Sequence, residues 1–96
     1  MSDVITTAVA ALQAKMPSGF SGGVAKFVIP GEGSIIADGG GVRAEDGDAD
    51  VTLTAEGEVF KAILEGEMNA TMAFMSGKLA VDGNMGLAMQ LGAALG

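Results

Sequence analysis

The eleven residues Met85–Leu95, MGLAMQLGAAL, constrain most strongly how this chain can fold. Their single polar side chain is Gln90, so a helix built from them is apolar on every side. Such a helix is normally buried all round, in contact with lipid, or at an interface. At this length it is too short to span a bilayer. It must therefore cover a core with one face and meet a second apolar surface, a partner or a ligand with another.

Methionine is concentrated just before this helix and within it. Five of the seven methionines fall within one short stretch, namely Met68, Met72, Met75, Met85 and Met89. Methionine is unbranched and polarizable, so it suits surfaces that repack around ligands of variable shape. Methionine is also ordinary core filler, and the sequence leaves these two interpretations evenly open.

The charge balance excludes several classes of partner. Twelve acidic residues against five basic ones give a net charge of −7. This argues against a nucleic-acid partner, because binding to nucleic acid depends on Lys and Arg contacts to phosphate. It also argues against lasting attachment to anionic membranes, which requires basic clusters. We expect transient membrane contact at most.

The residue types that are missing narrow the function further. The chain contains no His, Cys, Tyr or Trp, so most of the usual acid–base and nucleophilic groups are absent. We therefore expect that the protein is not an enzyme and needs no cofactor. The N-terminus lacks the basic start of a signal peptide, and no apolar run approaches the ~20 residues of a membrane span. These features predict a cytoplasmic protein.

Two stretches resemble the start of a ligand-binding motif without completing it. Gly31–Ile36, GEGSII, begins like a dinucleotide fingerprint, but Ile36 replaces the third glycine and no helical pattern follows. Glu45–Asp50 begins like a calcium loop, but Val51 and Gly57 occupy the positions of its glycine and its last glutamate. We interpret both stretches as turns and expect no metal site.

The apolar periodicity changes several times along the chain and so predicts its elements. Asp50–Thr54, DVTLT, alternates as a strand, and Asn69 and Asn84 can each cap a helix that follows. In chain order we expect a helix at 3–15, strands at 24–29, 34–38, 42–45 and 50–54, a helix ending at 66, a helix at 70–75, a strand at 78–81 and the last helix. This order predicts an α+β fold in one domain, residues 1–96, with helices covering one face of a sheet.

Four sequence blocks between about Phe27 and Leu91 resemble the sterol carrier protein-2 family of lipid-transfer domains. The blocks are ADVTLT at Ala49–Thr54, VFKAILEG at Val59–Gly66, NATMAF at Asn69–Phe74, and GKL with GNMGLAM at Gly77–Leu79 and Gly83–Met89. They stand in the family's order and cover about two-thirds of the chain, which makes them more specific together than any one motif.

This resemblance implies a five-stranded, mainly antiparallel sheet with helices packed on one face around an apolar tunnel. The tunnel would hold a fatty acid, a fatty acyl chain or a sterol-like lipid, which the family binds and transfers without a catalytic site of its own. The side chains that the resemblance places in the tunnel wall are Phe60, Ile63, Leu64, Met72, Met75, Leu79, Met85 and Met89. Strand alternation adds Phe27, Val51 and Leu53 on the covered face of the sheet.

One departure from the family pattern bears on the ligand, and one alternative function stays open. Gln90 stands where the family often has a lysine, so a positive charge that could meet an anionic head group is absent. This narrows the expected ligand toward a neutral lipid or a simple acyl chain. The alternative is an interaction module of the same fold with a filled core, in which Met85–Leu95 is the surface of a homodimer.

Overall fold

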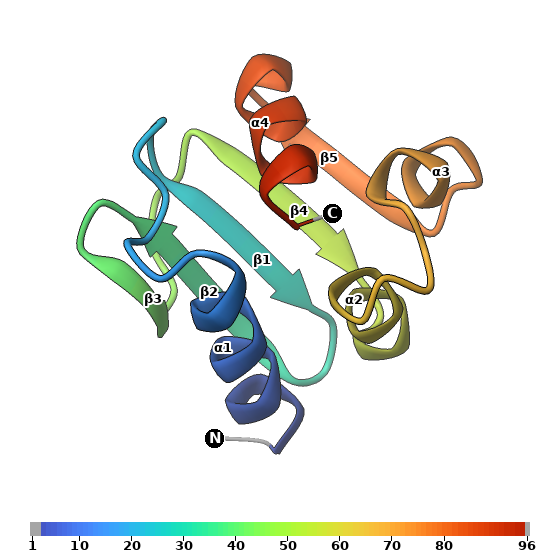
Figure 1. Cartoon of the computed structure of the whole chain (residues 1–96), viewed down its shortest axis with the longest axis horizontal. Coiled ribbons are helices and arrows are strands. Elements are labelled where there is room, and N and C mark those ends of the chain that lie inside the picture. The colour runs from blue at the N-terminus through green and yellow to red at the C-terminus, as the bar shows by residue number, and fades with distance from the viewer. Residues whose placement is uncertain (1–2, 96) are drawn as a thin grey trace.

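Within residues 3–95, which the computed structural model describes, a five-stranded sheet forms one layer and four helices form the other (Figure 1). The helices are α1 (Asp3–Lys15), α2 (Gly57–Leu64), α3 (Ala70–Met75) and α4 (Met85–Leu95). The strands are β1 (Ala25–Ile29), β2 (Gly33–Asp38), β3 (Gly41–Ala44), β4 (Val51–Ala55) and β5 (Leu79–Gly83). The expected α+β fold with helices on one face of the sheet is confirmed.

The sheet has the strand order β3-β2-β1-β4-β5, and β1 and β4 in its middle are parallel. The remaining pairs are antiparallel, as expected. The parallel pair arises because the chain leaves β3 at one edge and returns beside β1 through the acidic turn. Asp50 anchors that return: its backbone N–H donates to the Val24 carbonyl at 2.8 Å, and its Oδ2 accepts from the Val24 N–H at 2.9 Å.

The core lies between the sheet and the helices. Alternate residues of β1 and β4 are buried, as their alternating sequences predict. Phe27 on β1 meets Phe60 on α2 edge to face, with ring centroids 5.8 Å apart. Leu91 and Leu95 on α4 are 0% and 2% exposed. No charged or polar side chain of residues 3–95 is buried, so apolar burial is the main force holding the layers together.

The start of α4 is fixed to the edge of the sheet by Gly83 and Asn84. Gly83 has φ +99°, and a Cβ there would collide with the carbonyl oxygen of Asp50. Only glycine fits this position without strain. The Asn84 N–H donates to that same carbonyl at 2.9 Å, and Asn84 Oδ1 accepts from the Leu87 N–H at 3.1 Å. Asn84 is therefore the helix cap that the sequence predicts.

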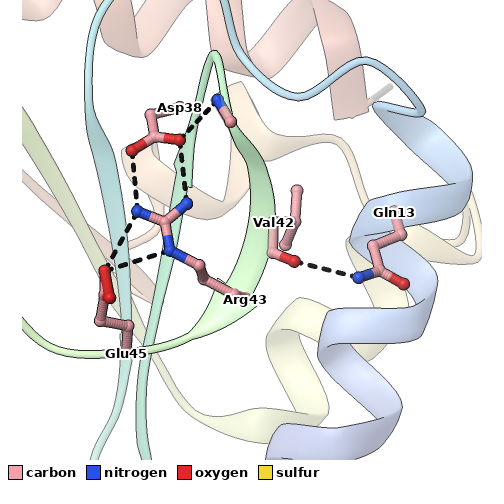
Figure 2. Close-up of polar contacts among 6 residues, drawn as sticks. Gln13, Asp38, Val42, Arg43 and Glu45 are labelled. Atoms are coloured by element: carbon pink, nitrogen blue, oxygen red, sulfur yellow. Dashed lines mark hydrogen bonds and ion pairs between the residues drawn. The ribbon is translucent and has the colours of Figure 1, made fainter.

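Arg43 joins two carboxylates on the outer face of the sheet (Figure 2). Its guanidinium donates to both oxygens of Asp38, at 2.9 Å each, and lies 3.1 Å from an oxygen of Glu45. The hydrogen bonds from Arg43, followed by one from the Gly40 N–H, lower the pKa of Asp38 from 3.8 to about 2. The fork-to-fork geometry explains the size of this effect.

Protonation of Asp38 is therefore expected to destabilise the fold at low pH. Because the pKa is lower in the folded chain, the stabilisation is complete above about pH 4 and is lost as the pH falls from 3.8 toward 2. Asp38→Asn should lower the urea midpoint at pH 6 and have little effect near pH 2. In an Arg43→Gln background the same substitution should have little effect at either pH. If the urea midpoints of wild type and Asp38→Asn differed by the same amount at pH 6 and near pH 2, the ionised Asp38 would not be the source of the stabilisation.

Candidate functional site

Helix α4 presents two apolar faces, and only one of them is used by the core. Leu87, Leu91 and Leu95 follow each other at intervals of four and face the sheet, where the last two are fully buried. Met85 and Met89 on the other face are 49% and 75% exposed. An all-round apolar helix at this position therefore leaves an apolar face outside the core, as its sequence requires.

This second face of α4 forms one wall of a groove, which we call the α3–α4 groove. Its volume is about 560 Å³, within the ~300–1,000 Å³ usual for small-molecule sites. Its floor comes from the edge of the sheet, through Leu53, Leu79 and Val81. Helices α3 and α4 supply the walls, through Asn69, Ala70, Thr71, Phe74, Met85, Ala88, Met89, Gly92, Ala93 and Leu95. No ionisable side chain of residues 3–95 lines it.

Helix α3 is the lightly anchored wall of this groove. It is six residues long, and Ala73 is its only buried residue. Its first turn depends on Asn69, whose Oδ1 accepts from the N–H groups of Thr71 at 2.8 Å and Met72 at 3.3 Å. Such short helices are marginal without tertiary packing. Of the two walls, α3 therefore has less buried packing to hold it in place than α4.

A second groove of about 730 Å³ lies between α1 and α2, and we call it the α1–α2 groove. In the part of the chain that the structure describes, it shares no lining residue with the α3–α4 groove. Apolar and small residues make most of its floor, and ionisable side chains lie among its lining. The lining comprises Asp3, Val4, Thr7, Ala8, Ala11, Ile29, Pro30, Glu32, Glu56, Gly57, Glu58, Phe60, Lys61, Leu64 and Glu65.

Five of the eight residues that the resemblance places in the tunnel wall line one of the grooves, and so does Leu53 from the covered face of the sheet. Leu79, Met85 and Met89 come together in the α3–α4 groove. Phe60 and Leu64 line the α1–α2 groove. The two sets lie at different ends of the helical layer, so the structure does not bring all five into one pocket.

The other three tunnel-wall residues lie outside both groove linings, as do Phe27 and Val51 from the covered face of the sheet. Phe27 and Ile63 are each 1% exposed and belong to the central core. Met72 and Met75 project from α3 and are 68% and 79% exposed. Their assignment to a tunnel wall stays a prediction about a ligand-bound form of the protein.

Several residues of the α3–α4 groove were missed at the level of sequence. Ala88 and Gly92 could have been found from helical spacing, because each lies three residues after one of the predicted methionines, Met85 or Met89. Ala88 and Gly92 are small, so this side of α4 leaves space in the groove that larger side chains would fill. Phe74 carried no comparable signal, because its helix is too short to show a period.

Gln90 lies on the side of α4 that faces the glycine-rich loop before β1. A Cβ on Gly22 would come within 2.6 Å of Gln90 Oε1 and 3.1 Å of Leu87 Cδ2. Gln90 does not line either groove. Within residues 3–95, no group of three or more acidic residues is placed to hold a metal ion. No helix in that range has both the length and the apolar character needed to cross a membrane.

Comparison with known proteins places these features in a family. Residues 10–96 match the model of the SCP-2 sterol transfer family. Human sterol carrier protein 2 is 39% identical over 80 residues, and the Dictyostelium discoideum peroxisomal multifunctional enzyme A is 43% identical over 65. The aligned parts are 80% and 68% of this chain but only 14% of each relative, so the chain spans a small part of their length.

A solved structure extends the comparison to the whole fold. The structure of palmitated SCP2L2 from Aedes aegypti superposes with a TM-score of 0.71 at 26% identity. The superposition covers 99% of this chain and 95% of that one, so the same layers and connections are present along nearly the entire chain. The chain therefore belongs to the SCP-2 sterol transfer family, a family of lipid-binding and lipid-transfer domains.

Proposed function

We propose that the protein binds and transfers a hydrophobic ligand without catalysis, and that the α3–α4 groove receives the ligand's apolar chain. The ligand class is a fatty acid, a fatty acyl chain or a sterol-like lipid. The observation that carries the proposal is a groove with a floor on the sheet, walls of small and methionine side chains, and no ionisable lining residue in the described chain. The palmitated relative of the same fold supports the ligand class.

Transfer of apolar groups from water supplies the binding free energy. Each buried methylene contributes about 0.8 kcal/mol, so a sixteen-carbon chain offers on the order of 10 kcal/mol before the costs of immobilisation. This is sufficient for micromolar binding without a charged contact. Because the lining of the groove is uncharged, the head group stays in solvent, which favours a simple acyl chain or a neutral lipid.

On this proposal, the acyl chain of the ligand reaches the apolar core when α3 moves outward. The small side chain of Ala73 is the only fully buried one on α3, whereas α4 is held by the larger Leu91 and Leu95. Movement of α3 would extend the groove past Leu79 toward the core residue Ile63. A tunnel of the kind expected for the family would then form with the ligand, and Met72 and Met75 could turn toward it.

Filling the groove should weaken fatty-acid binding selectively. Ala93 lines the α3–α4 groove, whereas the adjacent Ala94 is exposed and does not line it. Ala93→Leu should weaken palmitate binding about tenfold, because the larger side chain displaces roughly two methylenes of ligand. Ala94→Leu is the matched control and should bind palmitate within about twofold of wild type. Both affinities are measured by isothermal titration with palmitate below its critical micelle concentration.

If Ala93→Leu and Ala94→Leu weakened palmitate binding equally, the assignment of the ligand to this groove would be contradicted. It would also be contradicted if both variants kept the palmitate affinity of the wild type. Native mass spectrometry of the purified protein tests the carrier function directly, by finding bound fatty acid or another amphiphile. Absence of lipid after gentle purification, together with failure to bind palmitate, would count against a carrier.

The exposed methionines of α3 and α4 favour one alternative, a homodimer through Met85–Leu95. Met72, Met75 and Met89 are each more than two-thirds exposed, which is uncommon for large apolar side chains. A lipid-free dimer in native mass spectra that is dispersed by Met89→Asp would support this alternative. A monomer that carries lipid would support the carrier.

We propose that residues 1–96 act as a single lipid-binding domain and that it works in the cytoplasm. The matched relatives are several times longer, and one of them is named as a peroxisomal enzyme. Imaging of the tagged native protein tests the location.

A further inference from the structure

We propose that the α1–α2 groove is a second ligand site, selective for single-chain amphiphiles with a cationic head group such as a quaternary ammonium. The proposal rests on this groove alone and is independent of fatty-acid binding in the α3–α4 groove. The two grooves have no lining residue in common within the described range 3–95, so a substitution in one leaves the lining of the other unchanged.

The floor of the α1–α2 groove can receive an alkyl chain. Ile29 at the end of β1 and Phe60 on α2 form the bottom of the groove. Their side chains are 2% and 4% exposed. Val4 lies against Gly57, where an added Cβ would sit 3.0 Å from Val4 Cγ1. The bare glycine therefore lets the first turns of α1 and α2 approach closely and closes one end of the groove. Its volume of about 730 Å³ is the larger of the two.

The lining of this groove carries an excess of negative charge. It includes five carboxylates from α1, the β1–β2 turn and α2 with the residue on each side of it, namely Asp3, Glu32, Glu56, Glu58 and Glu65. Among residues 3–95, Lys61 is the only basic residue in the lining. The ion pairs recorded within residues 3–95 join Lys26 and Arg43 to acids elsewhere, so none of them neutralises this groove.

Helix dipoles offset part of this charge but do not reverse it. The first turns of α1 and α2 both border the groove, and each contributes roughly +0.5 of a charge, whereas the last turn of α2 borders it through Leu64 and contributes roughly −0.5. The three helix termini together offset about half of one of the four net negative charges of the lining. A region with this excess of negative charge repels a carboxylate head group and attracts an ammonium. The uncharged α3–α4 groove makes no such distinction.

Two amphiphiles with the same tail test the site directly. Dodecyltrimethylammonium and dodecanoate are titrated below their critical micelle concentrations, at low ionic strength, while methyl NMR signals are followed. Dodecyltrimethylammonium should shift Ala8, Ala11 and Leu64, which line the α1–α2 groove. Dodecanoate should bind there at least about tenfold more weakly. Its strongest shifts should fall on Ala88 and Ala93 if the proposed carrier function is correct.

Paired charge variants separate a local effect from the effect of net charge. Glu58→Gln combined with Glu65→Gln removes two carboxylates from the groove, whereas Glu67→Gln combined with Asp82→Gln removes two exposed ones outside it. The first pair should weaken dodecyltrimethylammonium binding at least about fivefold and the second less than about twofold. Lys61→Gln should strengthen it, which guards against misreading a folding defect as lost affinity.

Three results would overturn the proposal. One is equal weakening by the two double variants, and another is equal affinity of the two amphiphiles at Ala8, Ala11 and Leu64. The third is a set of dodecyltrimethylammonium shifts confined to the α3–α4 groove. Failure of dodecanoate to shift Ala88 and Ala93 would instead count against the carrier function, and it would leave the cationic site unaffected.

Discussion

Replacement of Phe27 by alanine is expected to lower the free energy of unfolding by about 3–5 kcal/mol. Phe27 lies on the central strand β1, is 1% exposed, and packs edge to face on Phe60. The substitution removes a full aromatic side chain from between the sheet and α2, where neighbouring strands on both sides limit collapse. Urea unfolding at neutral pH measures the effect.

Two controls show whether Phe27 acts through packing in the core. Phe27→Leu keeps most of the apolar volume and should cost less than about 1.5 kcal/mol. Val28→Ala changes the next residue, on the outer face of the same strand, and should cost about 1 kcal/mol or less. A loss below 2 kcal/mol for Phe27→Ala would mean that the ring does not fill the core of the free protein.

A disulfide between α3 and α4 is expected to block uptake of fatty acid. A Cβ on Gly92 would lie 4.0 Å from the Cβ of Ala70, within the 3.5–4.5 Å typical of disulfides. The chain has no cysteine of its own, so Ala70→Cys with Gly92→Cys forms a single defined cross-link. If a cross-link opposes the opening of α3 by about 2 kcal/mol or more, palmitate uptake should slow about thirtyfold or more.

Reduction of the same sample is the matched control for this prediction. Uptake of a fluorescent fatty acid is followed by stopped flow before and after addition of dithiothreitol, and reduction should restore most of the rate. Each single cysteine variant should behave alike under both conditions. An oxidised double variant that takes up the ligand as fast as its reduced form would show that α3 and α4 need not separate.

The elements of this fold could be predicted because each one carries its own local signal. Asn84 marks the start of α4, and DVTLT in β4 has the period of two that a half-buried strand requires. These local signals did not predict that β1 and β4 pair in parallel. The parallel pairing depends on how Asp50 returns the chain to Val24, which is a contact between distant residues.

The candidate site was less predictable, because a groove is defined by what the core does not fill. Met85 and Met89 could be selected from the sequence, since a helix that is apolar all round needs a second surface. The α1–α2 groove could not be found that way. Its carboxylates come from three separate segments, and only the folded chain brings Glu32 to the same rim as Asp3 and Glu58.

Intermolecular nuclear Overhauser contacts between ¹³C-labelled palmitate and the protein test the central claim most directly. The α3–α4 groove predicts contacts from the acyl chain to the methyl groups of Met85, Ala88, Met89 and Ala93. Bound palmitate that contacts only Ala8, Ala11 and other residues between α1 and α2, or that leaves the α4 methyl groups without contacts, would contradict the account.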